Sequence, residues 1–208
     1  MIETRIVLDI IGLSLLIIAY LFIVIAGALN LKKEEKLQGS IFFIIIGAIE
    51  IVYGLLKGRL SSLVYTFMGF TPLTMNINHI IMYIIPNIIS MITFGILIII
   101  LGKKNSDRFG KNLLLSGIFW IVYSVILLIV NIIMFPASLF PLTPTLVLIF
   151  EIIAIIIIPL MVVSRIFLLL YALKIRVKCL TISSIILIIA SAVFFIYWII
   201  TLLMILVP

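Results

Sequence analysis

Long apolar stretches separated by short polar clusters form the dominant pattern of this chain. Each stretch is near or above the ~20 residues that a helix needs to cross the ~30 Å hydrocarbon core of a bilayer. They cover about residues 10–31, 40–56, 80–101, 112–135, 146–173 and 179–207. The pattern predicts an all-α, polytopic integral membrane protein with six transmembrane helices, forming one domain over residues 1–208.

The composition points to the same class of protein. Of the 208 residues, 66% are apolar and 10% are charged, and the mean hydropathy is +1.56. Soluble domains contain about 45–50% apolar and about 25% charged residues, so a water-exposed surface cannot be built from this sequence. The expected partner is therefore the lipid bilayer. The net charge of +7 is explained by membrane orientation and implies no nucleic-acid partner.

Basic residues concentrate after the first, third and fifth apolar stretches. Ten of the fourteen lie there, namely Lys32, Lys33, Lys36, Lys103, Lys104, Arg108, Lys111, Lys174, Arg176 and Lys178. Since cytoplasmic loops are enriched in lysine and arginine, we expect these turns inside the cell and both termini outside it. The high isoleucine content favours a prokaryotic plasma membrane. Ala26 to Ala28 resembles a signal-peptide cleavage site, but the long apolar run and the lysines that follow favour a retained helix.

The basic turns recur at a fixed interval, because Lys32, Lys103 and Lys174 are each 71 residues apart. The helix after each turn carries a small residue six positions before a tyrosine. These segments are Gly47-Ala-Ile-Glu-Ile-Val-Tyr53, Gly117-Ile-Phe-Trp-Ile-Val-Tyr123 and Ser191-Ala-Val-Phe-Phe-Ile-Tyr197. The pattern predicts three tandem two-helix hairpins, an internal repeat about an axis along the membrane normal. The alternative is chance similarity in an isoleucine-rich sequence.

Two charged residues are expected deep in the membrane. From the 1.5 Å helical rise, Glu50 lies roughly 16 Å and Arg165 roughly 13 Å from the cytoplasmic side. A charge at this depth costs about 2.5–3.5 kcal/mol on insertion scales, so both mark a candidate site. The first hypothesis is an ion pair that joins the second and fifth helices. The alternatives are an ion or solute transport site and contacts with a partner subunit.

Other small or helix-breaking residues have both structural and functional interpretations. Gly47 and Gly54 lie seven residues apart, which favours close packing between helices. Pro86, Asn87 and Pro159 are helix-break candidates, because proline removes a backbone hydrogen bond and broken helices form sites in some carriers. Proline also occurs in ordinary membrane helices. At these positions the sequence therefore allows either a broken helix that forms a site or an ordinary membrane helix that contains proline.

The sequence contains no recognised catalytic or metal-binding motif. One cysteine, Cys179, and one histidine, His79, cannot build a Cys/His metal cluster, so we expect no metal, no cofactor and no enzymatic activity. Polar residues at depth are few, which favours a non-catalytic accessory or scaffold subunit of a membrane complex, bound to other subunits or to itself. The alternative is a small transporter or channel that uses Glu50 and Arg165. The uncharged segments 60–78 and 136–145 could lie in the headgroup layer, cover the bundle or contact another protein.

Overall fold

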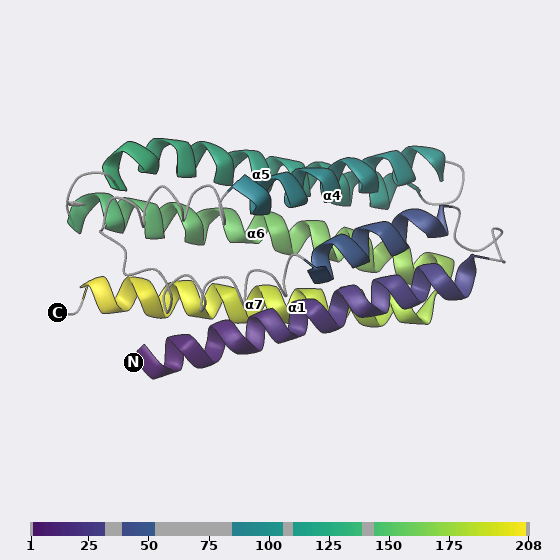
Figure 1. Ribbon diagram of the computed structural model, residues 1–208, viewed down its shortest axis with the longest axis horizontal. Coiled ribbons are helices and arrows are strands. Elements are labelled where there is room, and N and C mark those ends of the chain that lie inside the picture. Colours follow the sequence, from purple (N-terminus) through teal and green to yellow (C-terminus); the bar gives the residue numbers. More distant parts are fainter. Residues whose placement is uncertain (1, 32–38, 53–84, 106–109, 139–143, 207–208) are drawn as a thin grey trace.

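The computed structural model describes residues 2–31, 39–52, 85–105, 110–138 and 144–206, and every regular element in these ranges is an α-helix (Figure 1). The helices are α1 (Ile2–Asn30), a shorter helix (Ser40–Val52), α4 (Ile85–Lys104), α5 (Gly110–Ser138), α6 (Pro144–Ile175) and α7 (Lys178–Leu206). The all-helical class predicted from the sequence is confirmed for this part of the chain.

Four of the described helices contain segments long and apolar enough to cross a membrane. These segments are Ile10–Asn30 in α1, Gly110–Val130 in α5, Ile155–Ile175 in α6 and Lys178–Leu203 in α7. Large aliphatic side chains such as Ile10, Ile129 and Ile156 are exposed on the outside of the bundle, as a lipid-facing surface requires. The second expected span is described only over Ser40–Val52, and the third only from Ile85. Six crossings therefore remain a prediction.

The observed helix ends differ from the predicted ones where proline was expected to break the chain. α5 continues through Pro136 as far as Ser138, although the sequence predicted an end at residue 135. α6 already begins at Pro144. Proline is accepted in the first turn of a helix, because the backbone N–H that it lacks has no partner there. Both Pro136 and Pro144 therefore lie within helices.

At the end of the bundle that carries the exposed basic residues, helices end at asparagines or at a residue with a left-handed backbone conformation. Asn30 and Asn105 donate from Nδ2 to the carbonyls of Ala26 and Leu101, at 2.7 and 2.8 Å. Arg176 has a φ of 57°, and the following N–H, of Val177, donates to the carbonyl of Ala172. The Val177 bond satisfies a carbonyl that the helix C-terminus leaves without an intrahelical partner, whereas the carbonyl of Leu101 accepts both the backbone N–H and the side-chain amide of Asn105.

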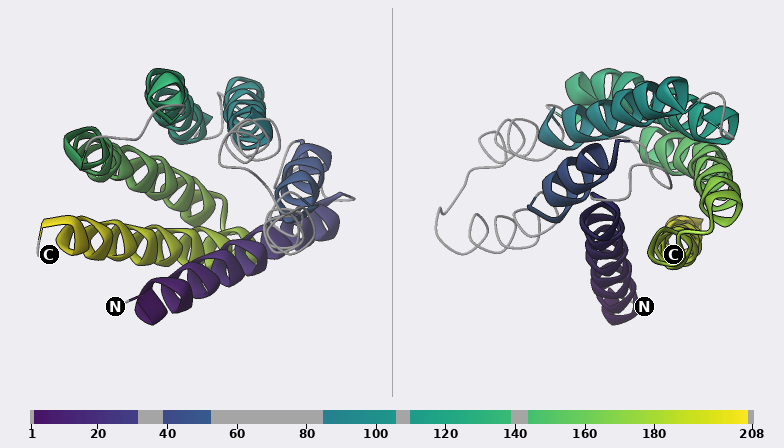
Figure 2. Two further views of the ribbon diagram at one scale, coloured as in Figure 1. Left: turned by 60° about the vertical axis from the view of Figure 1, so that its left-hand side comes forward. Right: turned by 90° about the vertical axis from the view of Figure 1, so that its right-hand side faces the viewer.

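The helices are arranged in a ring that follows chain order (Figure 2). α4 packs on α5, α5 on α6, and α6 on α7, and the ring is closed by α7 packing along α1. The Ser40–Val52 helix packs against α1, and Gly39 just before it touches Leu101 of α4. Every helix therefore presents one face to a common interior, and residues distant in sequence meet there.

Glycines allow the closest approaches between neighbouring helices. A Cβ atom on Gly47 would lie 2.8 Å from the carbonyl oxygen of Tyr20 in α1. A Cβ on Gly117 of α5 would lie 2.9 Å from the carbonyl oxygen of Gly95 in α4. The close helix packing predicted at Gly47 is thus confirmed.

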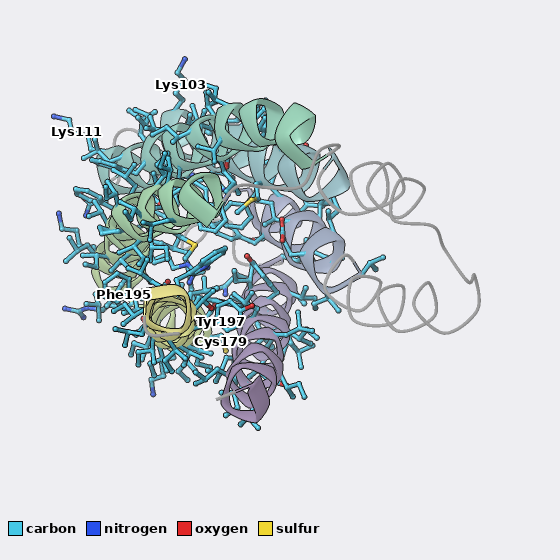
Figure 3. The ribbon with its side chains drawn as sticks, turned by 90° about the vertical axis from the view of Figure 1, so that its left-hand side faces the viewer. Lys103, Lys111, Cys179, Phe195 and Tyr197 are labelled. Atoms are coloured by element: carbon cyan, nitrogen blue, oxygen red, sulfur yellow. The ribbon has the colours of Figure 1, made fainter. Side chains whose placement is uncertain are left out.

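The ends of α4 and α6 and the starts of α5 and α7 lie at one end of the ring, and both chain termini lie toward the other (Figure 1). The exposed cations at this end are Lys103, Lys104, Lys111, Lys174, Arg176 and Lys178. Lys103 and Lys111 point away from the bundle (Figure 3). One end of the molecule is therefore strongly cationic, and this is the end that the sequence predicts to face the cytoplasm.

Candidate functional site

Arg165 lies in the interior of the ring, with only 3% of its surface exposed. It projects from α6, and its Nη1 donates to the carbonyl oxygen of Leu187 and to the hydroxyl of Ser191, both on α7. The Ser191 hydroxyl in turn donates to the same carbonyl at 2.9 Å. Hydrogen bonds from a charged donor contribute about 1.5–3 kcal/mol each, so this arrangement fixes the guanidinium against α7.

An aromatic cluster, formed by Tyr20, Phe94, Trp120 and Tyr123, occupies the interior next to Arg165. The Cζ atom of Arg165 lies 5.4 Å from the Trp120 ring centroid, within cation–π range, and a desolvated contact of this kind contributes about 2 kcal/mol. The Phe94 and Trp120 centroids are 4.9 Å apart, and Tyr20 meets the Phe94 ring edge-on at 6.2 Å. All four side chains are buried, so the charge of Arg165 lies among aromatic rings.

Glu50 is buried on the Ser40–Val52 helix, with 9% of its surface exposed. Its carboxylate is close enough to Arg165 and to Tyr20 to act on them electrostatically. Glu50 and Arg165, which the sequence placed at similar depth, therefore both lie in the interior and within electrostatic reach of each other. A direct ion pair between them remains a prediction.

Two nitrogen donors of this site have no hydrogen-bond partner among the described residues. They are Nε of Arg165 and Nε1 of Trp120, and both are buried. Leaving a buried donor unsatisfied costs about 1–3 kcal/mol, and more when the group is charged. Most buried polar atoms in native proteins are paired, so these two donors are the most unusual feature of the interior.

Buried serines add polar contacts that the sequence analysis did not single out. Ser164 of α6 donates to the carbonyl oxygen of Ser116 in α5 at 2.7 Å. Ser183 of α7 donates to the carbonyl oxygen of Ala19 in α1 at 2.9 Å. Both bonds join neighbouring helices of the ring. The repeat pattern had already marked Ser191, but its bond with Arg165 depends on the register between α6 and α7, which sequence spacing does not reveal.

The proposed helix-break residues do not interrupt the helices that the structure describes. Pro86 and Asn87 are in the first turn of α4, where proline is tolerated. Pro159 lies inside α6, which remains helical on both sides of it, and its side chain is exposed on the outside of the ring. His79 and most of the uncharged segments lie outside the described residues.

The chemistry available in this interior is electrostatic attraction and hydrogen bonding. Within the described ranges, histidine, cysteine, aspartate and glutamate side chains do not gather into a group of three that could hold a metal ion. Comparisons with protein-family models, with curated proteins and with solved structures found no match. The function is therefore argued from the site alone.

Proposed function

We propose that this chain is a non-catalytic membrane protein that transports a small solute, with Arg165 and Glu50 at the transport site. The observation that carries the proposal is the burial of Arg165 in the ring interior, where two nitrogen donors of the site have no hydrogen-bond partner in the part of the chain that the structure describes. Ionisable residues inside membrane helices are costly, and they commonly mark the pathway of an ion or solute.

The main sequence argument against transport is the small number of polar residues at depth. The fold supports transport in this respect, because it directs polar groups from several helices toward the same interior. Besides Glu50 and Arg165, the buried set includes Ser116, Ser124, Ser164, Ser183, Ser184 and Ser191. Phenol groups of Tyr20 and Tyr123 are buried in the same region. A few convergent polar groups in a largely apolar surround are typical of small-molecule sites.

The contacts also support the hypothesis of three repeated hairpins. Gly47, Gly117 and Ser191, the small residues of the three similar segments, each face the preceding helix. Gly47 contacts α1, Gly117 contacts α4, and Ser191 accepts a hydrogen bond from α6. Several carriers are built from parallel repeats related by an axis along the membrane normal. We propose the same arrangement here, with the basic end facing the cytoplasm of a prokaryotic cell and both termini outside.

The second candidate function is an accessory or scaffold subunit of a membrane complex. One observation favours it: much of the interior polar chemistry is satisfied within the ring. Nη1 of Arg165 bonds to α7, and Ser124 and Ser184 donate to the carbonyls of Trp120 and Leu180 in their own helices. In this case Arg165 is a structural group that holds α6 against α7.

A flux assay on proteoliposomes separates the two functions. The purified chain would be tested for uptake of radiolabelled amino acids, organic acids and amines, beside Glu50→Gln and Lys104→Gln variants. Transport predicts uptake that Glu50→Gln abolishes without lowering the melting temperature. Lys104→Gln, a change at the exposed end of α4, should leave uptake intact.

A scaffold predicts a different set of results. The tagged protein, extracted from its native membrane in mild detergent, would carry a fixed set of partners at stoichiometric amount, and no solute would be taken up. A structural ion pair would also give a distinct stability pattern: Glu50→Gln and Arg165→Leu would each cost about 3–5 kcal/mol, while the double variant would be close to the wild type. Together these results would refute the transport proposal.

A further inference from the structure

We propose that Arg165 and Trp120 form a binding site for a small anion with oxygen acceptors, of which a carboxylate is the simplest. This inference rests on the proposed transport function for its biological meaning, because it names the class of solute. Its structural basis is independent, and consists of the two buried nitrogen donors and the charge of the guanidinium.

The chemistry of the two donors determines what can bind. The N–H groups of arginine and of the tryptophan indole donate hydrogen bonds and cannot accept them. Nη1 of Arg165 is already committed to Leu187 and Ser191, whereas neither its Nε nor Nε1 of Trp120 has a partner among the residues that the structure describes. A ligand that satisfies both must therefore present acceptor atoms.

The two donors belong to side chains in direct contact. The guanidinium lies over the Trp120 ring, with its Cζ 5.4 Å from the ring centroid, so both donors belong to one stacked pair of groups, which a ligand with two acceptor oxygens would bridge. The positive charge of Arg165 favours a negatively charged acceptor, and hydrogen bonds between arginine and carboxylates are among the strongest in proteins.

Glu50 opposes the binding of an anion. Its charge acts on Arg165, so the carboxylate of Glu50 and the bound anion compete for the same guanidinium. This competition gives the site a means of release: an anion bound next to Glu50 is held less tightly than it would be by Arg165 alone. The inference therefore predicts that removing the charge of Glu50 strengthens anion binding.

The tryptophan content of the chain permits a direct test. There are only two tryptophans, Trp120 beside Arg165 and Trp198 near the end of α7, so Trp198→Phe leaves Trp120 as the only indole. The variant would be purified in detergent and titrated with sodium formate and sodium acetate, with ionic strength held constant by sodium chloride, whose anion carries no oxygen acceptor. We expect a saturable change in Trp120 emission.

Variants in the same background connect the signal to the site. Arg165→Lys keeps the positive charge and removes the Nε donor, and we expect binding at least ~10-fold weaker, as the loss of one charge-assisted hydrogen bond implies. Glu50→Gln should bind more tightly, and it keeps the test decisive if Arg165→Lys does not fold. Lys104→Gln should bind as the parent does. A separate Trp120→Phe variant, made in the otherwise unchanged chain so that Trp198 is retained, should show no saturable response.

Three outcomes would overturn the inference: no saturable response, equal affinity in Arg165→Lys, or weaker binding in Glu50→Gln. The flux assay separates this inference from the transport proposal. Anion binding without any uptake would support the anion site and refute the proposed transport function. Uptake of a neutral or cationic solute, without anion binding, would support the proposed transport function and refute the anion site.

Discussion

Gly117 lies where α5 crosses α4, and replacing it by alanine tests whether the ring depends on close backbone contact. The added Cβ would meet Cγ1 of Ile99 at 2.7 Å and, at 2.9 Å, both the Gly95 carbonyl oxygen and the Ile99 nitrogen. Two of these three atoms belong to the α4 backbone, which cannot move aside by a change of rotamer. Gly12 provides a matched control, because the three atoms nearest to its added Cβ all belong to the Phe194 ring, with Cζ at 2.9 Å.

The size of the effect follows from these distances. Ordinary van der Waals contact begins at 3.4 Å, so α4 and α5 must separate by about 0.5 Å, a gap that forfeits a quarter or more of each contact's attraction. Overpacking of this kind costs about 1–3 kcal/mol, against up to ~1 kcal/mol gained from the helix propensity of alanine. We expect Gly117→Ala to lose about 1–2 kcal/mol and Gly12→Ala to be nearly neutral.

Thermal unfolding in detergent measures this difference. The single cysteine, Cys179, is half-buried at the start of α7, so a thiol-reactive fluorophore reports its exposure as the ring opens. With the unfolding entropies of soluble domains, a loss of 1–2 kcal/mol lowers Tm by roughly 2–8 °C. If Gly117→Ala melts like the wild type, or if Gly12→Ala falls by as much, the close packing of α4 on α5 does not stabilise the protein as argued.

Two further predictions concern the buried guanidinium and the orientation. Ser191→Ala removes one acceptor from Arg165 and should cost about 1.5–3 kcal/mol by the same melting assay. Ser184→Ala, whose hydroxyl bonds within its own helix, should cost less, and equal losses would argue against a special role for Ser191. For the orientation, cysteines introduced at Lys104 and Ser138, in a background without the native cysteine, should be labelled from the cytoplasmic and the outer side respectively. The reverse pattern would invert the proposed topology.

The sequence predicts the helical class and the depth of the charged residues, because both depend on properties along the chain. Helical rise alone placed Glu50 and Arg165 at similar depth, and both are buried in the ring interior. The contacts of Arg165 with Trp120 and Ser191 could not be predicted, since they depend on how neighbouring helices are rotated and aligned. Pro159 illustrates the same limit: its position in α6 was known, but its exposure on the outer face required the packing.

The ring also has a consequence for how the protein enters the membrane during synthesis. The groups that accept hydrogen bonds from Arg165 lie 22 and 26 residues later in the chain, at Leu187 and Ser191. When α6 first reaches the insertion machinery, its arginine therefore lacks these partners, and an arginine at the centre of a lone helix costs about 2.5–3.5 kcal/mol. We expect α6 and α7 to partition into the bilayer as a pair, so a chain stopped after Ile175 should insert poorly and be degraded.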